Sequence, residues 1–322
     1  MLTYVLFAIG FVFLLKGADW LVDGASALAR RLRISSLTIG LTVVAFGTSA
    51  PELGVNLYAS LQGTTDIAIS NILGSNIFNI LFILGISAII YPLFVREDTV
   101  WKQIPLTLLA AVVLGILAND SLIDKAGLSV LTRIDGLILL IFFMIFMYYI
   151  FETARQERKE GKEPGIGTKQ YGLTKTLSLI ILGLVVLSLG SKWLVDGAVK
   201  LAETLGASQS LIGLTIVAAG TSLPELATST MAAYKKNAEL AVGNIVGSNI
   251  FNIFFIIGIS SVVTPLPFDN ASNIDTGVTI IASALLFIAM FTGAKRHLLE
   301  RWEGIIFVAL YAGFIAYSVL RG

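Results

Sequence analysis

Long apolar stretches recur along the chain, and short polar or charged segments separate them. Each stretch is close to the roughly 20 residues that an α-helix needs to cross the hydrocarbon core of a bilayer. The stretches lie near 2–28, 36–60, 67–91, 102–118, 135–151, 174–203, 209–233, 239–263, 276–293 and 305–320. The pattern predicts an all-α membrane protein with ten transmembrane helices.

Composition agrees with a chain that is buried in lipid. Hydrophobic residues make up 56% of the chain, charged residues only 13%, and the mean hydropathy is +0.87, whereas soluble domains carry roughly 25% charge. The first stretch contains Lys16, Asp19 and Asp23, and no cleavage site follows a short apolar core. We therefore interpret it as a retained helix and not as a signal peptide.

Three short motifs occur twice in the chain. WLVDGA, GTSxPE and GSNIFN begin at residues 20, 47 and 74 and again at residues 193, 220 and 247, an offset of 173 residues each time. A constant offset without gaps indicates an internal duplication. We expect a first repeat over 1–151, a linker over 152–173 and a second repeat over 174–322.

Each repeat holds five predicted spans, and five is an odd number. Tandem copies with an odd number of spans enter the membrane from opposite sides, which predicts two inverted-topology repeats of five helices. Transporters of this kind bind their substrate near the bilayer midplane, at the interface between the repeats.

Basic residues predict the orientation of the chain. With the N-terminus outside, the inner loops collect sixteen Lys and Arg residues and the outer loops four. Positive charge is retained on the cytoplasmic side. We expect a multi-pass protein of the cell (plasma or inner) membrane, with both termini outside and a cytoplasmic linker.

Glu52 and Glu225 lie in the middle of apolar stretches, at equivalent positions of the two copies. An ionisable group at membrane depth costs about 2.5–3.5 kcal/mol on insertion scales and marks a functional site by default. The alternative is a protonated carboxyl that bonds a neighbouring helix. The symmetric repetition favours an ion site.

A proline precedes each glutamate, and it removes one backbone donor and crowds the preceding turn. We expect carbonyls around Ala45 to Thr48 and Ala218 to Thr221 to lose helical partners. Such carbonyls persist in a membrane only where they line a cavity or bind something. Hydroxyls three or four residues before the glutamates share their helical face: Thr48, Ser49, Thr221 and Ser222. The alternative is a proline kink that serves packing.

The GSNIFN motifs supply further polar groups. Ser75 and Asn79, like Ser248 and Asn252, are spaced i, i+4 and share a face. The alternative is a seam of small residues for helix packing. Other asparagines of this region could bond across helices instead: Asn71, Asn76, Asn244 and Asn249.

The candidate ligands are all oxygens, and the chain has no cysteine. Ca²⁺ takes six to eight oxygen ligands, whereas zinc and copper prefer sulfur or imidazole. Two carboxylates neutralise one Ca²⁺ or two Na⁺, which suits an exchanger. The transported ions are thus expected to be Na⁺ and Ca²⁺, and no cofactor is expected.

The GTSxPE and GSNIFN segments resemble the alpha repeats of the cation/calcium exchanger superfamily, specifically the prokaryotic sodium/calcium exchangers. The resemblance covers essentially the whole chain. It implies ten helices, Na⁺-driven Ca²⁺ movement and sliding of the first helix of each copy. It also implies that Glu52 and Glu225 are the central carboxylates and that Asn79 is a site asparagine. The implied Na⁺-binding hydroxyls are those of Ser49, Ser222, Ser75 and Ser248. The implied carbonyl donors are Ala45, Thr48, Ala218 and Thr221.

One position departs from some relatives. The K⁺-dependent branch carries Asp where Asn252 stands, which argues against K⁺ co-transport. Proton-coupled Ca²⁺ antiport on the same fold and a passive cation channel are the alternatives that we keep. A net charge of +1 gives no reason to expect a nucleic-acid partner, and the chain has no extramembrane domain for an obligate protein partner. We expect a transporter embedded in the lipid bilayer, not an enzyme. On the first helix of each copy we expect the local ion pairs Lys16–Asp19 and Lys192–Asp196.

Overall fold

The computed structural model describes residues 2–62, 65–123, 125, 128–160, 171–205, 218–293 and 295–321. The first copy contains α1 (Leu2–Leu32), α2 (Ser36–Ile39), η1 (Gly40–Val44), α3 (Ala45–Thr48), α4 (Ala50–Gln62), α5 (Thr65–Ile77), η2 (Phe78–Ile83), α6 (Leu84–Ile90), β1 (Leu93–Phe94), η3 (Thr99–Gln103), α7 (Ile104–Leu117), α8 (Asp120–Ile123), β2 (Val130–Leu131) and α9 (Arg133–Glu160). The η elements are π-helical turns within longer helices.

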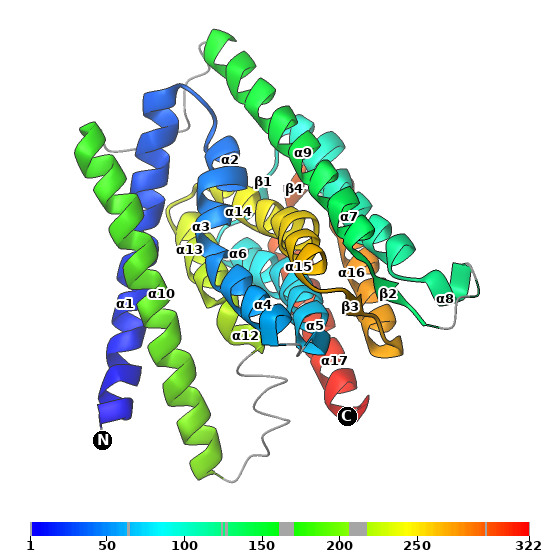
Figure 1. The fold of residues 1–322 in the computed structure, drawn as a ribbon. Coiled ribbons are helices and arrows are strands. Elements are labelled where there is room, and N and C mark those ends of the chain that lie inside the picture. Colours follow the sequence, from blue (N-terminus) through cyan, green and yellow to red (C-terminus); the bar gives the residue numbers. More distant parts are fainter. Residues whose placement is uncertain are drawn as a thin grey trace.

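The second copy repeats much of this order. It contains α10 (Leu173–Thr204), α12 (Ala218–Thr221), α13 (Leu223–Tyr234), α14 (Ala238–Ile250), η5 (Phe251–Ile257), α15 (Gly258–Val263), β3 (Leu266–Pro267), α16 (Asn270–Ala289), β4 (Leu298–Leu299) and α17 (Arg301–Arg321). The helices form one bundle, and α1 and α10 run side by side along one of its edges (Figure 1).

Membrane-spanning length is confirmed for most of the expected spans. Within the described residues eight helices are long and apolar enough to cross a bilayer, and a bent pair, Ser36–Thr48 with Ala50–Gln62, raises the number to nine. The bent pair matches the stretch expected at 36–60. The span expected at 209–233 lies partly outside the described residues, which there show only α12 and α13.

Two parts of the chain differ from expectation in their local structure. The helix α9 continues through Glu160, so the first part of the expected linker is helical. Four strands of two residues each accompany the helices, and β1 pairs with β4 while β2 pairs with β3, both antiparallel. Each strand pair therefore joins one copy to the other.

The helices α1 and α10 approach each other closely because glycines face the contact. A Cβ added to Gly17 would lie 2.6 Å from the Leu187 nitrogen, and one added to Gly190 would lie 2.6 Å from the Leu14 nitrogen. Only a residue without a side chain fits such a backbone approach. The two long helices thus form one tightly packed pair.

The ion pairs on these helices are partly as expected. Lys192 contacts Asp196 at 2.9 Å, which confirms that local pair. The expected Lys16–Asp19 pair is wrong, because Asp19 contacts Lys235 at 2.6 Å and Lys235 also contacts Asp23 at 2.7 Å. Lys235, which follows α13, lies between the two aspartates and contacts both.

The centre of the bundle is formed by the GSNIFN helices. The α5–α6 and α14–α15 spans are the most buried of those described, and their apolar faces supply fully buried core residues such as Leu73, Ile77, Ile250 and Phe254. A π-helical turn begins within each motif, η2 at Phe78 and η5 at Phe251, so that Asn79 and Asn252 lie in these turns. Such turns recur at functional sites because they redirect side chains within a helix.

Candidate ion-binding site

Both glutamates follow a break in their helix. Ser49 and Ser222 leave helical geometry (ψ 6° and 7°) between α3 and α4 and between α12 and α13, and the first break bends the helix by 45°. Pro51 and Pro224 come two residues later, where a missing N–H is tolerated at the start of the next helix. The breaks place both carboxylates in the interior of the bundle.

The carbonyls at the first break are arranged differently from expectation. Ala45 keeps a helical hydrogen bond, because its carbonyl accepts from the Ser49 N–H at 3.0 Å. Proline removes the donor only for the residue four positions earlier, which is Gly47 in the first copy and Gly220 in the second. The expectation that the Ala45 carbonyl loses its helical partner was therefore wrong. Ala218 begins α12, and its carbonyl stays a predicted ligand.

The carboxylates are bonded across the two copies. The Ser49 hydroxyl donates to Glu225 Oε1 at 2.9 Å, and the Ser222 hydroxyl donates to Glu52 Oε1 at 3.2 Å. Each glutamate is only 1% exposed. From the sequence we expected each hydroxyl to share a helical face with the glutamate of the same copy. Because the helix breaks at the serine, the hydroxyl bonds the glutamate of the other copy instead.

The serines of the GSNIFN motifs behave unequally. The Ser248 hydroxyl donates to Glu225 Oε1 at 3.3 Å. The Ser75 hydroxyl is fully buried and has no hydrogen-bond partner. Both serines lie in the core, as expected of site residues, but only one contacts a carboxylate.

Asparagines link the central helices reciprocally. Asn79 Nδ2 donates to Asn249 Oδ1 at 2.9 Å, and Asn252 Nδ2 donates to Asn76 Oδ1 at 3.0 Å. Asn76 and Asn249 also donate to each other's backbone carbonyl at 3.3 Å. These bonds orient Asn79 and Asn252 so that the amide nitrogens are satisfied and the oxygens Oδ1 have no protein partner.

The threonines next to the breaks also bond across the copies. Thr48 Oγ1 donates to Asn244 Oδ1 at 3.1 Å, and Thr221 Oγ1 donates to Asn71 Oδ1 at 3.4 Å. The bonding of asparagines across helices, held open as an alternative for Asn71 and Asn244, is confirmed. The threonine hydroxyls thus contact the other copy, and Thr48 and Thr221 stay predicted ligands.

Two polar residues near the site were missed. Asn56 Nδ2 donates to the Glu52 carbonyl at 3.0 Å, and Ser229 accepts from Asn244 Nδ2 at 2.9 Å. Both are fully buried. Each lies four residues after a glutamate, so the i, i+4 spacing was the signal that could have found them.

Five buried oxygens of the predicted site residues have no hydrogen-bond partner: Glu52 Oε2, Glu225 Oε2, Asn79 Oδ1, Asn252 Oδ1 and Ser75 Oγ. Asn56 Oδ1 has none either. Buried polar groups are nearly always bonded, and each exception needs an explanation. Among the described residues neither glutamate takes part in an ion pair. Oxygens of carboxylate, amide and hydroxyl groups without a protein partner are the kind of ligand that a dehydrated cation takes.

Two buried carboxylates surrounded by neutral oxygens, between two copies of one helical unit, define a secondary transporter for cations. The sequence profile described as "Sodium/calcium exchanger protein" matches residues 2–152 and 175–320. The chain belongs to this family.

Individual relatives agree with the family assignment. The chain is 33% identical over 343 residues to the sodium/calcium exchanger MaX1 of Methanosarcina acetivorans, with 97% of each chain covered. It is 36% identical over 328 residues to the inner membrane protein YrbG of Escherichia coli, with 99% and 97% covered. A solved structure of the sodium-calcium exchanger NCX_Mj covers 98% of both chains with a TM-score of 0.81 and 37% identity.

Proposed function

We propose that this protein exchanges Na⁺ for Ca²⁺ across the membrane at the site between Glu52 and Glu225. The observation that carries the proposal is the crossed bonding of two almost fully buried carboxylates by Ser49 and Ser222. One carboxylate oxygen on each glutamate is held by serine and the other is left for an ion.

Charge balance favours this pair of ions. With both carboxylates ionised, one Ca²⁺ or two Na⁺ bring the formal charge of the site to zero. An uncompensated charge in a low-dielectric interior is very costly. The loaded site can therefore change its exposure from one side to the other, and the empty site cannot easily do so.

The ligands divide by chemistry. We assign Ca²⁺ to the two carboxylates with the carbonyls of Thr48, Thr221, Ala45 and Ala218, because Ca²⁺ favours several oxygens with formal charge among them. We assign Na⁺ to the hydroxyls of Ser49, Ser222, Ser75 and Ser248, each of which retains acceptor capacity. Asn79 and Asn252 supply neutral oxygens at the centre.

The repeat architecture supports an inverted arrangement of ten helices. The strands β1 and β4 lie after the third span of the first copy and before the last span of the second, so the proposed orientation places both inside. β2 and β3 likewise both fall outside, and each of these two pairs is hydrogen-bonded. These pairings support the proposed arrangement, in which the repeats span 1–151 and 174–322, both termini are outside and the linker 152–173 is in the cytoplasm.

Alternating access requires part of the bundle to move. The pair α1–α10 is the candidate for the moving part, since it packs along one edge of the bundle (Figure 1) and its glycine contact keeps both helices together. Sliding of this pair would expose the glutamates first to one side and then to the other.

Ion flux in proteoliposomes tests the function. The purified protein is reconstituted, and ⁴⁵Ca²⁺ uptake is followed with an outward Na⁺ gradient, with a pH gradient, and with neither. We expect uptake only with the Na⁺ gradient. Uptake that follows the pH gradient alone would favour a proton antiporter, and uptake without any counter-ion gradient would favour a channel.

A further inference from the structure

An apolar groove of about 860 Å³ lies between the first copy's kinked helix, α9 and α10. Its walls include Phe46 and Gly47, Phe143 and Met147 of α9, and Val185 and Ser188 of α10. The volume falls within the roughly 300–1,000 Å³ of small-molecule sites. The side chains of Phe46 and Val185 are 54% and 50% exposed, so the groove opens toward the surroundings of the bundle.

The depth of the groove limits what can occupy it. Its α10 wall lies near the middle of the Leu173–Thr204 span. Lys175 is nine residues from Leu184, or about 13 Å along a helix, which is close to half of the roughly 30 Å hydrocarbon core. The hydroxyl of Thr42, a polar wall residue, already donates to the Thr38 carbonyl at 2.7 Å. A hydrocarbon chain fits such a lining.

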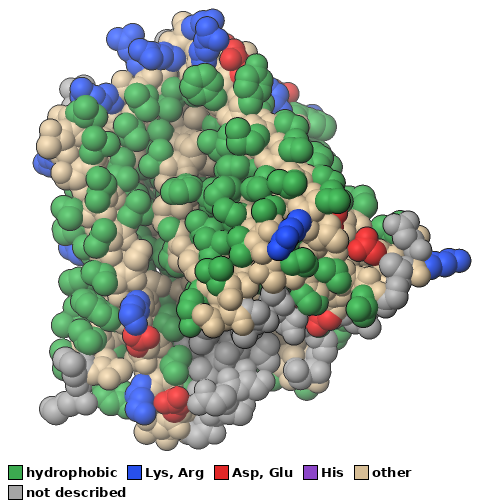
Figure 2. Space-filling view, in the orientation of Figure 1, with side chains coloured by type: hydrophobic (Ala, Val, Ile, Leu, Met, Phe, Trp, Pro, Cys, Tyr) green, Lys and Arg blue, Asp and Glu red, His purple; other side chains and the backbone are tan. Residues whose placement is uncertain are grey.

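Basic side chains mark the end of the bundle from which that chain would descend. α10 begins near Lys175, α9 ends near Arg158, and α1 ends with Arg30 and Arg31. Figure 2 shows Lys and Arg side chains gathered at this end, with apolar side chains covering the surface below. The Arg30 Nε atom is buried without a hydrogen-bond partner. Such a cluster attracts anionic lipid headgroups, at about 1 kcal/mol per basic residue near the surface.

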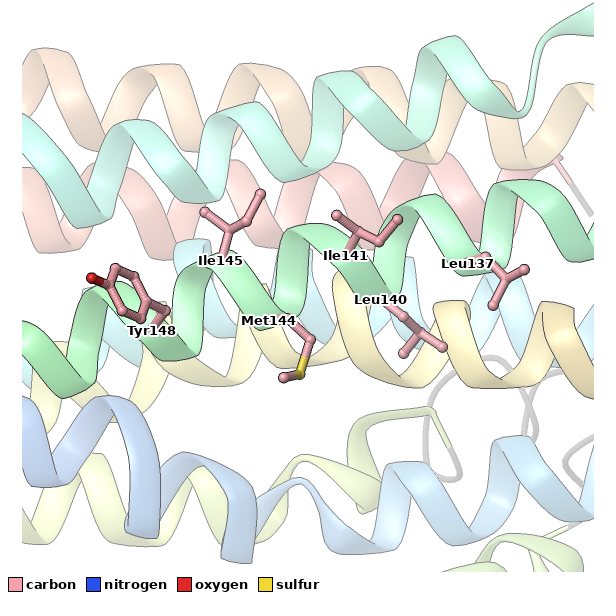
Figure 3. Close-up of a pocket in the computed structure, with 6 residues that line it drawn as sticks. All are labelled: Leu137, Leu140, Ile141, Met144, Ile145 and Tyr148. Atoms are coloured by element: carbon pink, nitrogen blue, oxygen red, sulfur yellow. The ribbon is translucent and has the colours of Figure 1, made fainter.

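A second apolar hollow, on α9, is a useful comparison for the groove. It is lined by six side chains of one helix (Figure 3): Leu137, Leu140, Ile141, Met144, Ile145 and Tyr148. No second helix contributes a wall, so we assign no ligand to it. The groove differs because the kinked helix, α9, α10 and Phe251 of η5 all line it.

We propose that the groove binds an acyl chain of an anionic phospholipid, with the phosphate held at the basic end of α1, α9 and α10. The chain would contact both the kink beside Ser49 and the face of α10. Leu184 packs against Gly47, where an added Cβ would lie 2.6 Å from a Leu184 methyl carbon. In the sliding motion proposed above, a bound chain would form part of the surface along which α10 moves.

Photo-crosslinking tests the site independently of transport. The full-length protein is reconstituted with phosphatidylglycerol that carries a diazirine near the end of one chain, and labelled peptides are mapped after irradiation. We expect labels concentrated on the segments around Phe46, Phe143 and Val185. Ser188→Trp, which fills the groove, should lower the labelling of the Phe46 segment several-fold.

Leu182→Trp is the matched control. Leu182 is 52% exposed on the same helix and is absent from the groove lining, so the label near Phe46 should persist. If Ser188→Trp does not fold, Ser188→Leu and the competition assay on unmodified protein take its place. In that assay, unlabelled phosphatidylglycerol should displace the probe better than phosphatidylcholine with the same chains.

Two results would overturn the proposal. Equal labelling of all lipid-facing helices, including the exposed Ile305 face of α17, would reduce the groove to ordinary lipid contact. Equal displacement by both lipids, or no loss of displacement in the Lys175→Gln, Arg158→Gln double variant, would remove the role of the anionic headgroup.

Discussion

The two helix breaks have equivalent sequences but different supports. In the second copy the Gly220 carbonyl, left without a helical donor by Pro224, accepts from the Ser191 hydroxyl at 2.9 Å. The equivalent of Ser191 in the first copy is Ala18, which has no hydroxyl to give. Glu225 also receives a bond from Ser248, whereas Ser75 does not bond Glu52.

This difference indicates two unequal halves of one site. The protein already supplies two hydroxyl donors to Glu225, so that carboxylate is held in place before an ion arrives. Glu52 receives one such hydrogen bond, from Ser222, and the Ser75 hydroxyl, at the position equivalent to Ser248, has no hydrogen-bond partner. A cation gains most where ligands are fixed but unsatisfied. The comparison can be tested by substitutions at equivalent positions.

The largest effect is expected at the carboxylates. Glu52→Gln and Glu225→Gln should each lower Ca²⁺ transport by about 100-fold or more, because loss of one partner in a buried charge cluster costs about 3–5 kcal/mol. Na⁺-driven ⁴⁵Ca²⁺ uptake measures this. Glu203→Gln, on the exposed part of α10, is the control and should transport normally. Near-normal uptake by either site variant would remove that glutamate from the site.

Substitutions of Ser75 and Ser248 should affect the two halves of the site differently. Ser75→Ala and Ser248→Ala should each raise the Na⁺ concentration for half-maximal exchange by about 5–10-fold, the equivalent of one lost hydrogen bond or ligand of roughly 1–1.5 kcal/mol. Only Ser248→Ala also frees Glu225, so it should weaken Ca²⁺ binding more. Unchanged Na⁺ dependence in both variants would assign the GSNIFN motif to packing alone.

A hydroxyl donor for the Gly47 carbonyl should stabilise the first helix break. Ser191→Ala leaves the Gly220 carbonyl without its side-chain donor and should lower stability by about 1–2 kcal/mol. Ala18→Ser supplies the missing hydroxyl near Gly47 and should raise the midpoint of thermal unfolding in detergent. If both changes shift the midpoint in the same direction, the two kinks do not differ in the way described.

The contact between Lys235 and the two aspartates of α1 should bias the position of α1. The residue equivalent to Lys235 in the first copy is Gln62. Gln62 has no charge and cannot form the equivalent ion pair with α10. These groups are about 25–34% exposed, and such pairs contribute about 1 kcal/mol or less. Lys235→Met should therefore change the ratio of the two positions of α1 only a few-fold.

Cysteine labelling can detect that change, because the chain has no native cysteine. A single Ala232→Cys, fully buried on α13, should react a few-fold faster from the cytoplasmic side when combined with Lys235→Met. Lys192→Met, which removes the exposed local pair on α10, is the control. Equal rates in all backgrounds would show that the Lys235 contact has no influence on access.

The smallest effect is expected for potassium. Asn252 is neutral, so no third negative charge at the site requires another cation. Replacing K⁺ by choline at controlled membrane potential should leave Na⁺-driven Ca²⁺ uptake unchanged. A collapse of uptake without K⁺ would contradict our interpretation of Asn252. It would also place the protein nearer the K⁺-dependent exchangers.

The sequence predicted most of the spans, because hydropathy acts over long segments, and the 173-residue offset singled out Glu52 and Glu225, which are buried in the interior of the bundle. It did not predict which hydroxyl meets which carboxylate. Ser49 shares a helical face with Glu52 only if the helix continues, and the break at Ser49 sends its hydroxyl to Glu225. The partner of Asp19 was missed for a different reason, because Lys235 is far away in the sequence and reaches Asp19 only through tertiary packing.

The crossed contacts have a consequence for how the two copies depend on each other. Ser49 bonds Glu225, Ser222 bonds Glu52, Asn79 bonds Asn249, and each short strand pairs with one from the other copy. One copy alone therefore contains neither a complete site nor a closed bundle. In the inverted arrangement proposed above, a single five-helix unit would need a second unit in the opposite orientation to complete the site. Joining both units in one chain allows them to differ, as Ser191 and Ala18 do.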